Sequence, residues 1–133
     1  PYGAKVFING HLKMALDLNA TGVHYSSTQL MRMQARPENV LCGASCHNQQ
    51  ELAQAARLGL DYVMLSPVQA TLSHVGAKAL GWEMFANLIQ DYPLPVFALG
   101  GMRQGDLPVA RTHGAHGVAM QRALWLESFS AGF

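Results

Sequence analysis

The chain has 133 residues, of which 50% are hydrophobic and 13% are charged, and its formal net charge is +1. This composition is typical of one folded domain with a buried core and excludes a disordered chain. No basic cluster favours nucleic acid, and no apolar run reaches the ~20 residues needed to cross a bilayer, so we expect no nucleic-acid partner and no membrane partner.

Short β-branched runs alternate with amphipathic helical segments along the chain. We expect strands, in chain order, at residues 4–9, 22–26, 40–45, 61–66, 96–100 and 117–121. In the helical segment after residue 47, Asn48 and Glu51 have the spacing of a capping box, and Gly59 is placed for a left-handed stop. Alternation of this kind predicts βαβ units, with a parallel sheet covered by helices.

The later helical segments carry similar signals. From residue 81 onward, Trp82 and Phe85 share one face with the aliphatic pair at 88–89, which predicts packing into the core. Asp106 is placed to cap the next helix, with Pro108 in its first turn. These stripes predict core packing and no cofactor site.

The two cysteines and two of the histidines allow structural interpretations. Cys42 and Cys46 lie on one predicted strand and are expected to be small buried hydrophobes in a reducing cytoplasm. His24 lies on a predicted strand, and His47 stands just before a predicted helix. For both histidines a structural role and a catalytic role remain open.

Six βα units fit either an open doubly wound sheet or most of a closed barrel. A complete eight-stranded barrel usually needs at least ~200 residues, so this chain is short by two units. Both architectures place ligands at the carboxyl ends of the strands. In this sequence those ends are rich in hydroxyl and amide side chains and have almost no carboxylates.

Two stretches at the strand ends predict a binding site for a polar, anionic ligand. Gly100 and Gly101 follow a predicted buried strand, where glycine lets the backbone approach a ligand closely. The connection from Ser66 to His74 is longer than the others and rich in hydroxyls, which suits wrapping such a ligand. Arg122, after the last strand, could add positive charge.

Four segments, "GVHYS", "GASCHNQQELAQAARLGLDYVMLSPVQAT", "PVFALGGM" and "GAHGVAMQRALW", resemble in order and spacing the thiamine phosphate synthase and thiazole tautomerase (TenI-like) superfamily. The resemblance implies an α/β fold, a (β/α)₈ TIM barrel of which this chain represents about six βα units, strands three to eight. We therefore interpret residues 1–133 as one barrel domain that lacks its first two βα units and forms part of a longer chain.

The stretch "SHVGAKALGW" is most similar to the C-terminal barrel domain of bacterial proteins that join a MutT-type Nudix hydrolase to a synthase-like barrel. The resemblance thus allows a fused N-terminal Nudix domain as a partner. A homodimer is the other arrangement that we consider, because an isolated six-strand piece would have open sheet edges.

Residue by residue, the resemblance implies a site for a small phosphorylated ligand, either a thiazole phosphate or a thiamine-related compound. The candidate phosphate-binding residues are Thr71, Ser73, Gly100, Gly101 and Arg122. The candidate residues for the rest of the ligand are Asn9, Ser45 and Gln121. His74 stands where the synthases have a lysine, and it is the one candidate catalytic residue.

The chain departs from the family where the synthases hold Mg²⁺. Gly10 and Gln29 align with the two carboxylates that bind the ion there. We therefore predict no metal-ligating residue, and Mg²⁺ would be needed only if synthase activity is retained. Pro67 aligns with the catalytic histidine of the tautomerases, so that base is absent unless His74 replaces it.

Three functions follow, all in thiamine biosynthesis or salvage. The first is a synthase-like transferase that joins a thiazole phosphate to a pyrimidine-methyl diphosphate. The second is a thiazole tautomerase-like isomerase with His74 as general base. The third is a non-catalytic module that binds the ligand for an attached Nudix hydrolase.

Overall fold

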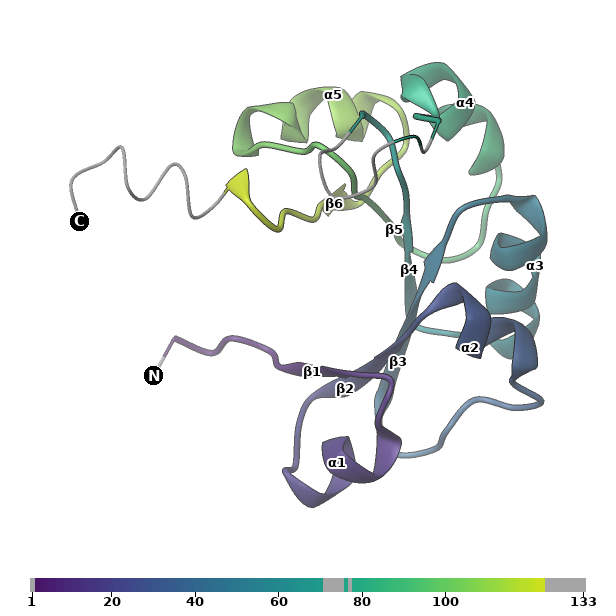
Figure 1. Cartoon of the computed structure of the whole chain (residues 1–133), viewed down its shortest axis with the longest axis vertical. Helices are drawn as coiled ribbons and strands as arrows, with labels where there is room; N and C mark the ends of the chain where they lie inside the picture. Colours follow the sequence, from purple (N-terminus) through teal and green to yellow (C-terminus); the bar gives the residue numbers. More distant parts are fainter. Residues whose placement is uncertain (1, 71–75, 77, 124–133) are drawn as a thin grey trace. The chain divides into compact units, whose positions relative to one another are not determined.

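A computed structural model of the chain describes residues 2–70, 76 and 78–123. In this part of the chain, strands alternate with helices, and six strands form one sheet in the order β1-β2-β3-β4-β5-β6 (Figure 1). The pairs β1–β2, β2–β3 and β5–β6 are parallel. The predicted α/β fold with a parallel sheet is confirmed.

The chain divides into two compact units, Pro1–Val63 and Met64–Phe133, and each is described by itself. The first unit contains β1 (Phe7–Asn9), α1 (Leu12–Asp17), β2 (Gly22–Tyr25), α2 (Ser27–Arg32), β3 (Leu41–Cys46) and α3 (Gln49–Leu58). Strand β4 (Tyr62–Leu65) crosses the boundary. The second unit contains α4 (Gly81–Leu88), β5 (Val96–Ala98), the 3₁₀ helix η1 (Gln104–Asp106), α5 (Leu107–Thr112) and β6 (Gly117–Val118).

The sheet of the first unit has one buried face and one more open face. On β2, Val23 and Tyr25 are buried, whereas His24 between them is half-buried. On β3, the residues from Cys42 to Cys46 are buried except for Ser45. Helices α2 and α3 pack against β3 and against each other, as Figure 1 shows. Because side chains alternate along a strand, His24 and Ser45 lie on the face that these helices do not cover.

Side-chain caps fix where helices α2 and α3 of the first unit begin. Helix α3 starts as predicted, because Oδ1 of Asn48 accepts a hydrogen bond from the Glu51 N–H at 2.9 Å. The reciprocal bond differs from the prediction: the Glu51 carboxylate accepts from the N–H of His47 at 2.6 Å, one residue before the cap. Helix α2 has a complete capping box between Ser26 and Gln29, which the sequence analysis did not identify.

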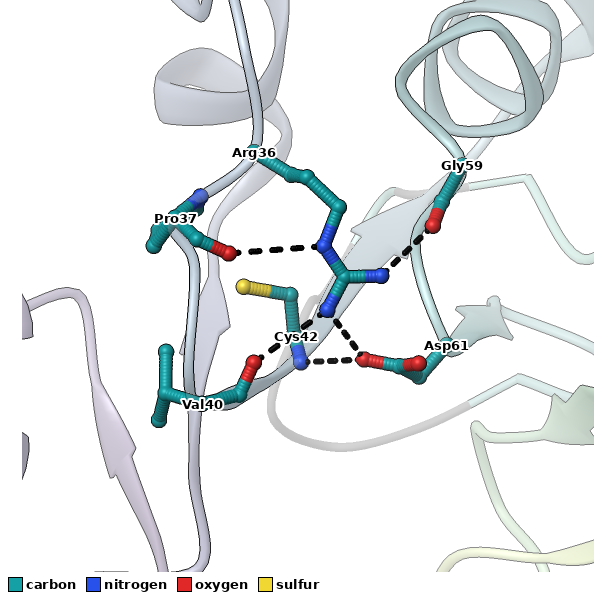
Figure 2. Close-up of polar contacts among 6 residues, drawn as sticks. All are labelled: Arg36, Pro37, Val40, Cys42, Gly59 and Asp61. Carbon is teal, nitrogen blue, oxygen red and sulfur yellow. Dashed lines mark hydrogen bonds and ion pairs between the residues drawn. The ribbon is translucent and has the colours of Figure 1, made fainter.

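An arginine clamp joins the loop after α2 to the start of β4 (Figure 2). The Arg36 guanidinium donates to the carbonyl of Gly59 at 2.7 Å and to that of Val40 at 3.2 Å. It also forms an ion pair with Asp61 at 2.7 Å, and the same Asp61 oxygen accepts from the Cys42 N–H at 2.8 Å. The clamp therefore holds the amino-terminal ends of β3 and β4 at the edge of the sheet away from the strand ends that bind ligands in such folds.

In the second unit, α4 packs its apolar face inward as predicted, with Phe85 and Ile89 buried. Trp82 is half-buried and stacks on His113, with ring centroids 5.4 Å apart. Asp106 occupies the N-cap position of α5 as predicted, but its side chain makes no capping bond there. Its carboxylate instead accepts from the Arg103 N–H at 2.8 Å, at the start of the preceding η1 turn. Among the described residues, no helix combines the length and apolar character that a membrane span requires.

Candidate functional site: polar strand ends

Three polar side chains share the open face of the first unit at the strand ends. The parallel register pairs Asn9 with His24 and His24 with Gly43. Ser45 lies two residues beyond Gly43 on the same strand. Because paired residues of a parallel sheet point to the same face, Asn9, His24 and Ser45 lie on one side of the sheet. The structure thus puts two predicted ligand-binding residues on one face, although their role stays a prediction.

His24 connects Ser45 to Tyr62 by hydrogen bonds at both ring nitrogens. Its Nε2 lies 2.8 Å from Oγ of Ser45, and its Nδ1 lies 2.9 Å from the hydroxyl of Tyr62. The His24 and Tyr62 rings are stacked, with centroids 5.7 Å apart. Burial lowers the pKa of His24 and raises the pKa of Tyr62 to about 12. Both rings are therefore neutral at neutral pH.

Gly43 makes room for this arrangement. A Cβ at Gly43 would lie 2.0 Å from Cζ of Tyr62, so only glycine lets the Tyr62 ring lie across β3. The Tyr62 ring also meets Phe7 edge-on, with centroids 5.4 Å apart. The sequence analysis missed the role of Tyr62. A glycine inside a buried strand, which often marks a close approach, was the available signal.

Gly10 and Gln29, which the sequence resemblance aligns with two magnesium-binding carboxylates, lie together, and their groups are neutral. Nε2 of Gln29 donates to the carbonyl of Gly10 at 3.3 Å. Oε1 of the same amide accepts from the Ser26 N–H at 3.0 Å, within the capping box of α2. In the described part of the chain, no three His, Cys, Asp or Glu side chains form a group that could hold a metal ion. The donor set at Gly10 and Gln29 therefore does not fit Mg²⁺, which prefers carboxylate oxygens.

In the second unit, the paired glycines pack against the segment that leads into the hydroxyl-rich loop. Gly100 and Gly101 have φ values of 106° and 66°, which favour glycine. A Cβ at Gly100 would lie 2.7 Å from Cα of Pro67, and one at Gly101 would lie 3.1 Å from the carbonyl oxygen of Ala70. Glycine at these positions thus allows a close approach of two chain segments, a reason that the sequence analysis did not foresee.

Four backbone hydrogen bonds fix the base of this loop. The N–H groups of Val68 and Gln69 donate to the carbonyls of Leu99 and Gly100 at 2.9 and 3.1 Å. The carbonyls of residues 67 and 68 accept from the N–H groups of residues 80 and 81 at 2.8 and 2.9 Å. The segment 67–69 is therefore held on both sides, next to the paired glycines.

Of the remaining candidate ligand-binding and catalytic residues, the structure describes only some. Thr71, Ser73 and His74 lie outside the described residues. Gln121 and Arg122 are exposed and follow β6, whose pairing with β5 is extended by a bond from the Ala119 N–H to the Ala98 carbonyl at 2.8 Å. Because β5 and β6 are parallel, Gln121 and Arg122 lie beyond the carboxyl end of β6, on the same side of the sheet's strand ends as Gly100 beyond β5.

The cysteines have the structural role that was predicted. Cys42 and Cys46 are both buried and free of disulfides. Burial raises the pKa of the Cys46 thiol to about 12, so it carries almost no thiolate at neutral pH. Both residues therefore act as small apolar core residues.

Comparison with known proteins identifies the family. A family model described as thiamine monophosphate synthase matches residues 1–124. The chain is 34% identical over 126 residues to the thiamine-phosphate synthase of Thermosynechococcus vestitus, covering 92% of this chain and 36% of that protein. It is 32% identical over 126 residues to the thiamine-phosphate synthase of Syntrophomonas wolfei, covering 92% of this chain and 60% of that protein.

A solved structure supports the same assignment. Thiamine phosphate pyrophosphorylase from Pyrococcus furiosus matches with a TM-score of 0.73 and 25% identity, over 92% of this chain and 59% of that one. The chain thus spans at most about three-fifths of these relatives. The family match covers all the strands of the sheet and the polar residues at their ends, and on this evidence the chain belongs to the thiamine monophosphate synthase family.

Proposed function

We propose that the chain binds a phosphorylated thiazole or thiamine-related compound and works as part of a thiamine-phosphate synthase. The transfer would form a bond from the thiazole nitrogen to the methylene carbon of the pyrimidine. It would break the bond from that carbon to oxygen, and diphosphate would leave. Binding and orienting the two phosphorylated groups is the contribution of this chain's own residues.

The packing of Gly100 and Gly101 against residues 67–70 carries the proposal. Two stretches that are separate in the sequence, and that each predict anion binding, meet at one edge of the sheet. Thr71 follows directly after Ala70, whose carbonyl faces Gly101. Hydroxyl groups and nearby backbone N–H groups are the donors expected for a phosphate, and Arg122 would add charge from the neighbouring strand end.

Calorimetric titration of the full chain with thiamine monophosphate tests the proposal. We expect Thr71→Ala and Ser73→Ala each to weaken binding about tenfold, since each removes one hydrogen bond to a charged group. Thr112→Ala is the matched control, because that hydroxyl bonds to the Val109 carbonyl on α5. No binding by the unmodified chain, or equal losses in all three variants, would contradict the proposal.

The contact between Gly10 and Gln29 favours a second candidate, a module that binds the ligand without catalysis. A departing diphosphate needs its charge neutralised, and these two groups are neutral. Incubating the chain with both substrates and Mg²⁺ separates the candidates: formation of thiamine phosphate supports the transferase, and tight binding without turnover supports the module. The isomerase with His74 as base stays a prediction, which His74→Asn would test by loss of isomerisation with binding retained.

A further inference from the structure

The hydrogen-bonded chain of Ser45, His24 and Tyr62 has a role beyond filling the open face of the sheet. Its members come from three strands, and both nitrogens of one imidazole are engaged, at 2.8 and 2.9 Å. Ser45 is half-buried and lies next to the carboxyl end of β3, so its hydroxyl can contact a ligand. A neutral imidazole that is bonded at both nitrogens donates one of these bonds and accepts the other.

The direction of these bonds follows from the chemistry of the two rings. With the pKa of Tyr62 raised to about 12, the phenol keeps its proton at neutral pH. Burial lowers the pKa of His24, so its ring is neutral and has one N–H. An imidazole nitrogen is a better acceptor than a phenol oxygen, and a phenol is the better donor. This chemistry favours a bond from the Tyr62 hydroxyl to Nδ1, with the proton of His24 on Nε2.

The consequence falls on Ser45. With the proton on Nε2, His24 donates to Oγ of Ser45, and the Ser45 hydroxyl hydrogen must point to another acceptor. We propose that His24 is a positioning residue that fixes Ser45 as a hydrogen-bond donor to an anionic oxygen of the ligand. This inference rests on the proposed phosphate-binding function. The opposite tautomer would leave Ser45 as an acceptor, which a phosphate oxygen cannot use.

Gly43 and Phe7 hold the geometry on which the direction depends. The Tyr62 ring lies over Gly43 and meets the Phe7 ring edge-on, so the phenol oxygen is held at Nδ1 of His24. Polarisation along such a chain strengthens each successive bond, which makes the Ser45 hydroxyl a better donor than an isolated serine.

Nitrogen-15 NMR of the histidine rings tests the direction without any ligand. The His24 signals are assigned by their absence in His24→Gln. We expect the proton on Nε2 in the unmodified chain and a mixture of tautomers in Tyr62→Phe, which lacks the donor. A proton on Nδ1 of His24 overturns the inference, whatever the chain binds.

Titration with inorganic diphosphate tests the action of His24 through Ser45. We expect Ser45→Ala to lower affinity about tenfold or more, and His24→Leu to lower it similarly. The double variant should lose no more than either single one, because the two residues act on the same bond. His24→Gln, whose amide can accept from Tyr62 and donate to Ser45, should recover part of the affinity. His116→Gln is the matched control, since that ring contacts Phe97 on β5.

Each outcome has one meaning. Additive losses in the double variant, or unchanged affinity in Ser45→Ala, overturn the inference. If His24→Leu does not fold, Tyr62→Phe replaces it in the same cycle with Ser45→Ala. A chain that binds neither diphosphate nor thiamine monophosphate overturns the proposed function, and the tautomer measurement then still decides the direction of the His24 bonds.

Discussion

At the scale of single residues, Tyr62 occupies the space that a side chain at Gly43 would need. The ring atoms Cζ, Cε1 and Cε2 would lie 2.0, 2.2 and 2.4 Å from a Cβ placed there. Because Gly43 has no side chain, the Tyr62 ring can lie over β3. In that position the Tyr62 hydroxyl bonds to His24 on β2. One glycine thus links packing to the chemistry of the open face.

Gly43→Ala should therefore displace the Tyr62 ring. We expect the free energy of unfolding to fall by about 1–3 kcal/mol, as for other overpacked sites, and the Tyr62–His24 bond to be lost. Urea denaturation measures the first effect. Gly105→Ala is the control, because a Cβ there meets nothing within 4 Å. Equal midpoints for both variants would show that the ring moves without cost.

The Arg36 clamp predicts a dependence of stability on acid. Burial by itself would raise the pKa of Asp61, but the hydrogen bonds from Arg36 and from the Cys42 N–H outweigh it and hold the pKa below the ordinary 3.8. The folded chain therefore binds this proton less readily than the unfolded chain. The contribution to stability is complete above about pH 3.8 and is lost as the pH falls through the lowered value.

In Asp61→Asn, the free energy of unfolding should fall less steeply as the pH drops through that acid range. At pH 7 we expect a loss of only about 1 kcal/mol, because the two side chains are 30% and 34% exposed and water screens the pair. Chemical denaturation at a series of pH values measures both effects. The control Asp17→Asn breaks an exposed pair with Lys13 and should change neither. An unchanged acid profile in Asp61→Asn would contradict the assignment.

At the scale of elements, local signals decide where helices begin, and α3 shows this most clearly. Asn48 caps its first turn, and Gly59 ends it with a φ of 67°. Asn48→Ala should lower the free energy of unfolding by about 1 kcal/mol, since it leaves the Glu51 N–H without its acceptor. Thermal denaturation followed by circular dichroism measures this. Gln50→Ala, exposed in the same turn, should have almost no effect.

The sequence predicts the elements better than it predicts their contacts. The predicted strands all recur in the described sheet, in order, because each combines an apolar run with nearby turn residues. Their ends differ: the strand predicted at 96–100 stops at Ala98, where the chain turns into the positive φ of Gly100. Gly100 and Gly101 could be singled out because two adjacent glycines after a strand are a local pattern.

The group around His24 could not be predicted in this way. Its contacts depend on the register of three strands, which no local pattern gives. The clamp was missed for the same reason, since Arg36 reaches Gly59 and Asp61 from a loop more than twenty residues away in the sequence. Expectations for His24 were therefore divided between a structural and a catalytic role, and the structure shows a ring satisfied at both nitrogens.

At the scale of the whole molecule, ligand binding should raise the free energy of unfolding. If thiamine monophosphate binds the folded chain and not the unfolded one, a concentration of about 100 times Kd should add about 2.7 kcal/mol to the free energy of unfolding. Thermal denaturation with and without the compound measures this gain. Ser73→Ala, with affinity about tenfold weaker, should lose about half of it at the same concentration, whereas Thr112→Ala should keep it. Equal gains in both variants would place the binding elsewhere.

The four backbone hydrogen bonds at residues 67–69 do not depend on which side chains stand in the connection that follows them. Whatever sequence stands between Ala70 and Ala79 starts and finishes at anchored points, since the bonds to residues 80–81 and 99–100 involve main-chain atoms alone. Exchanging or lengthening that stretch should therefore change which compound is recognised and leave the strands intact. The connection is a natural place to graft new specificity onto this scaffold.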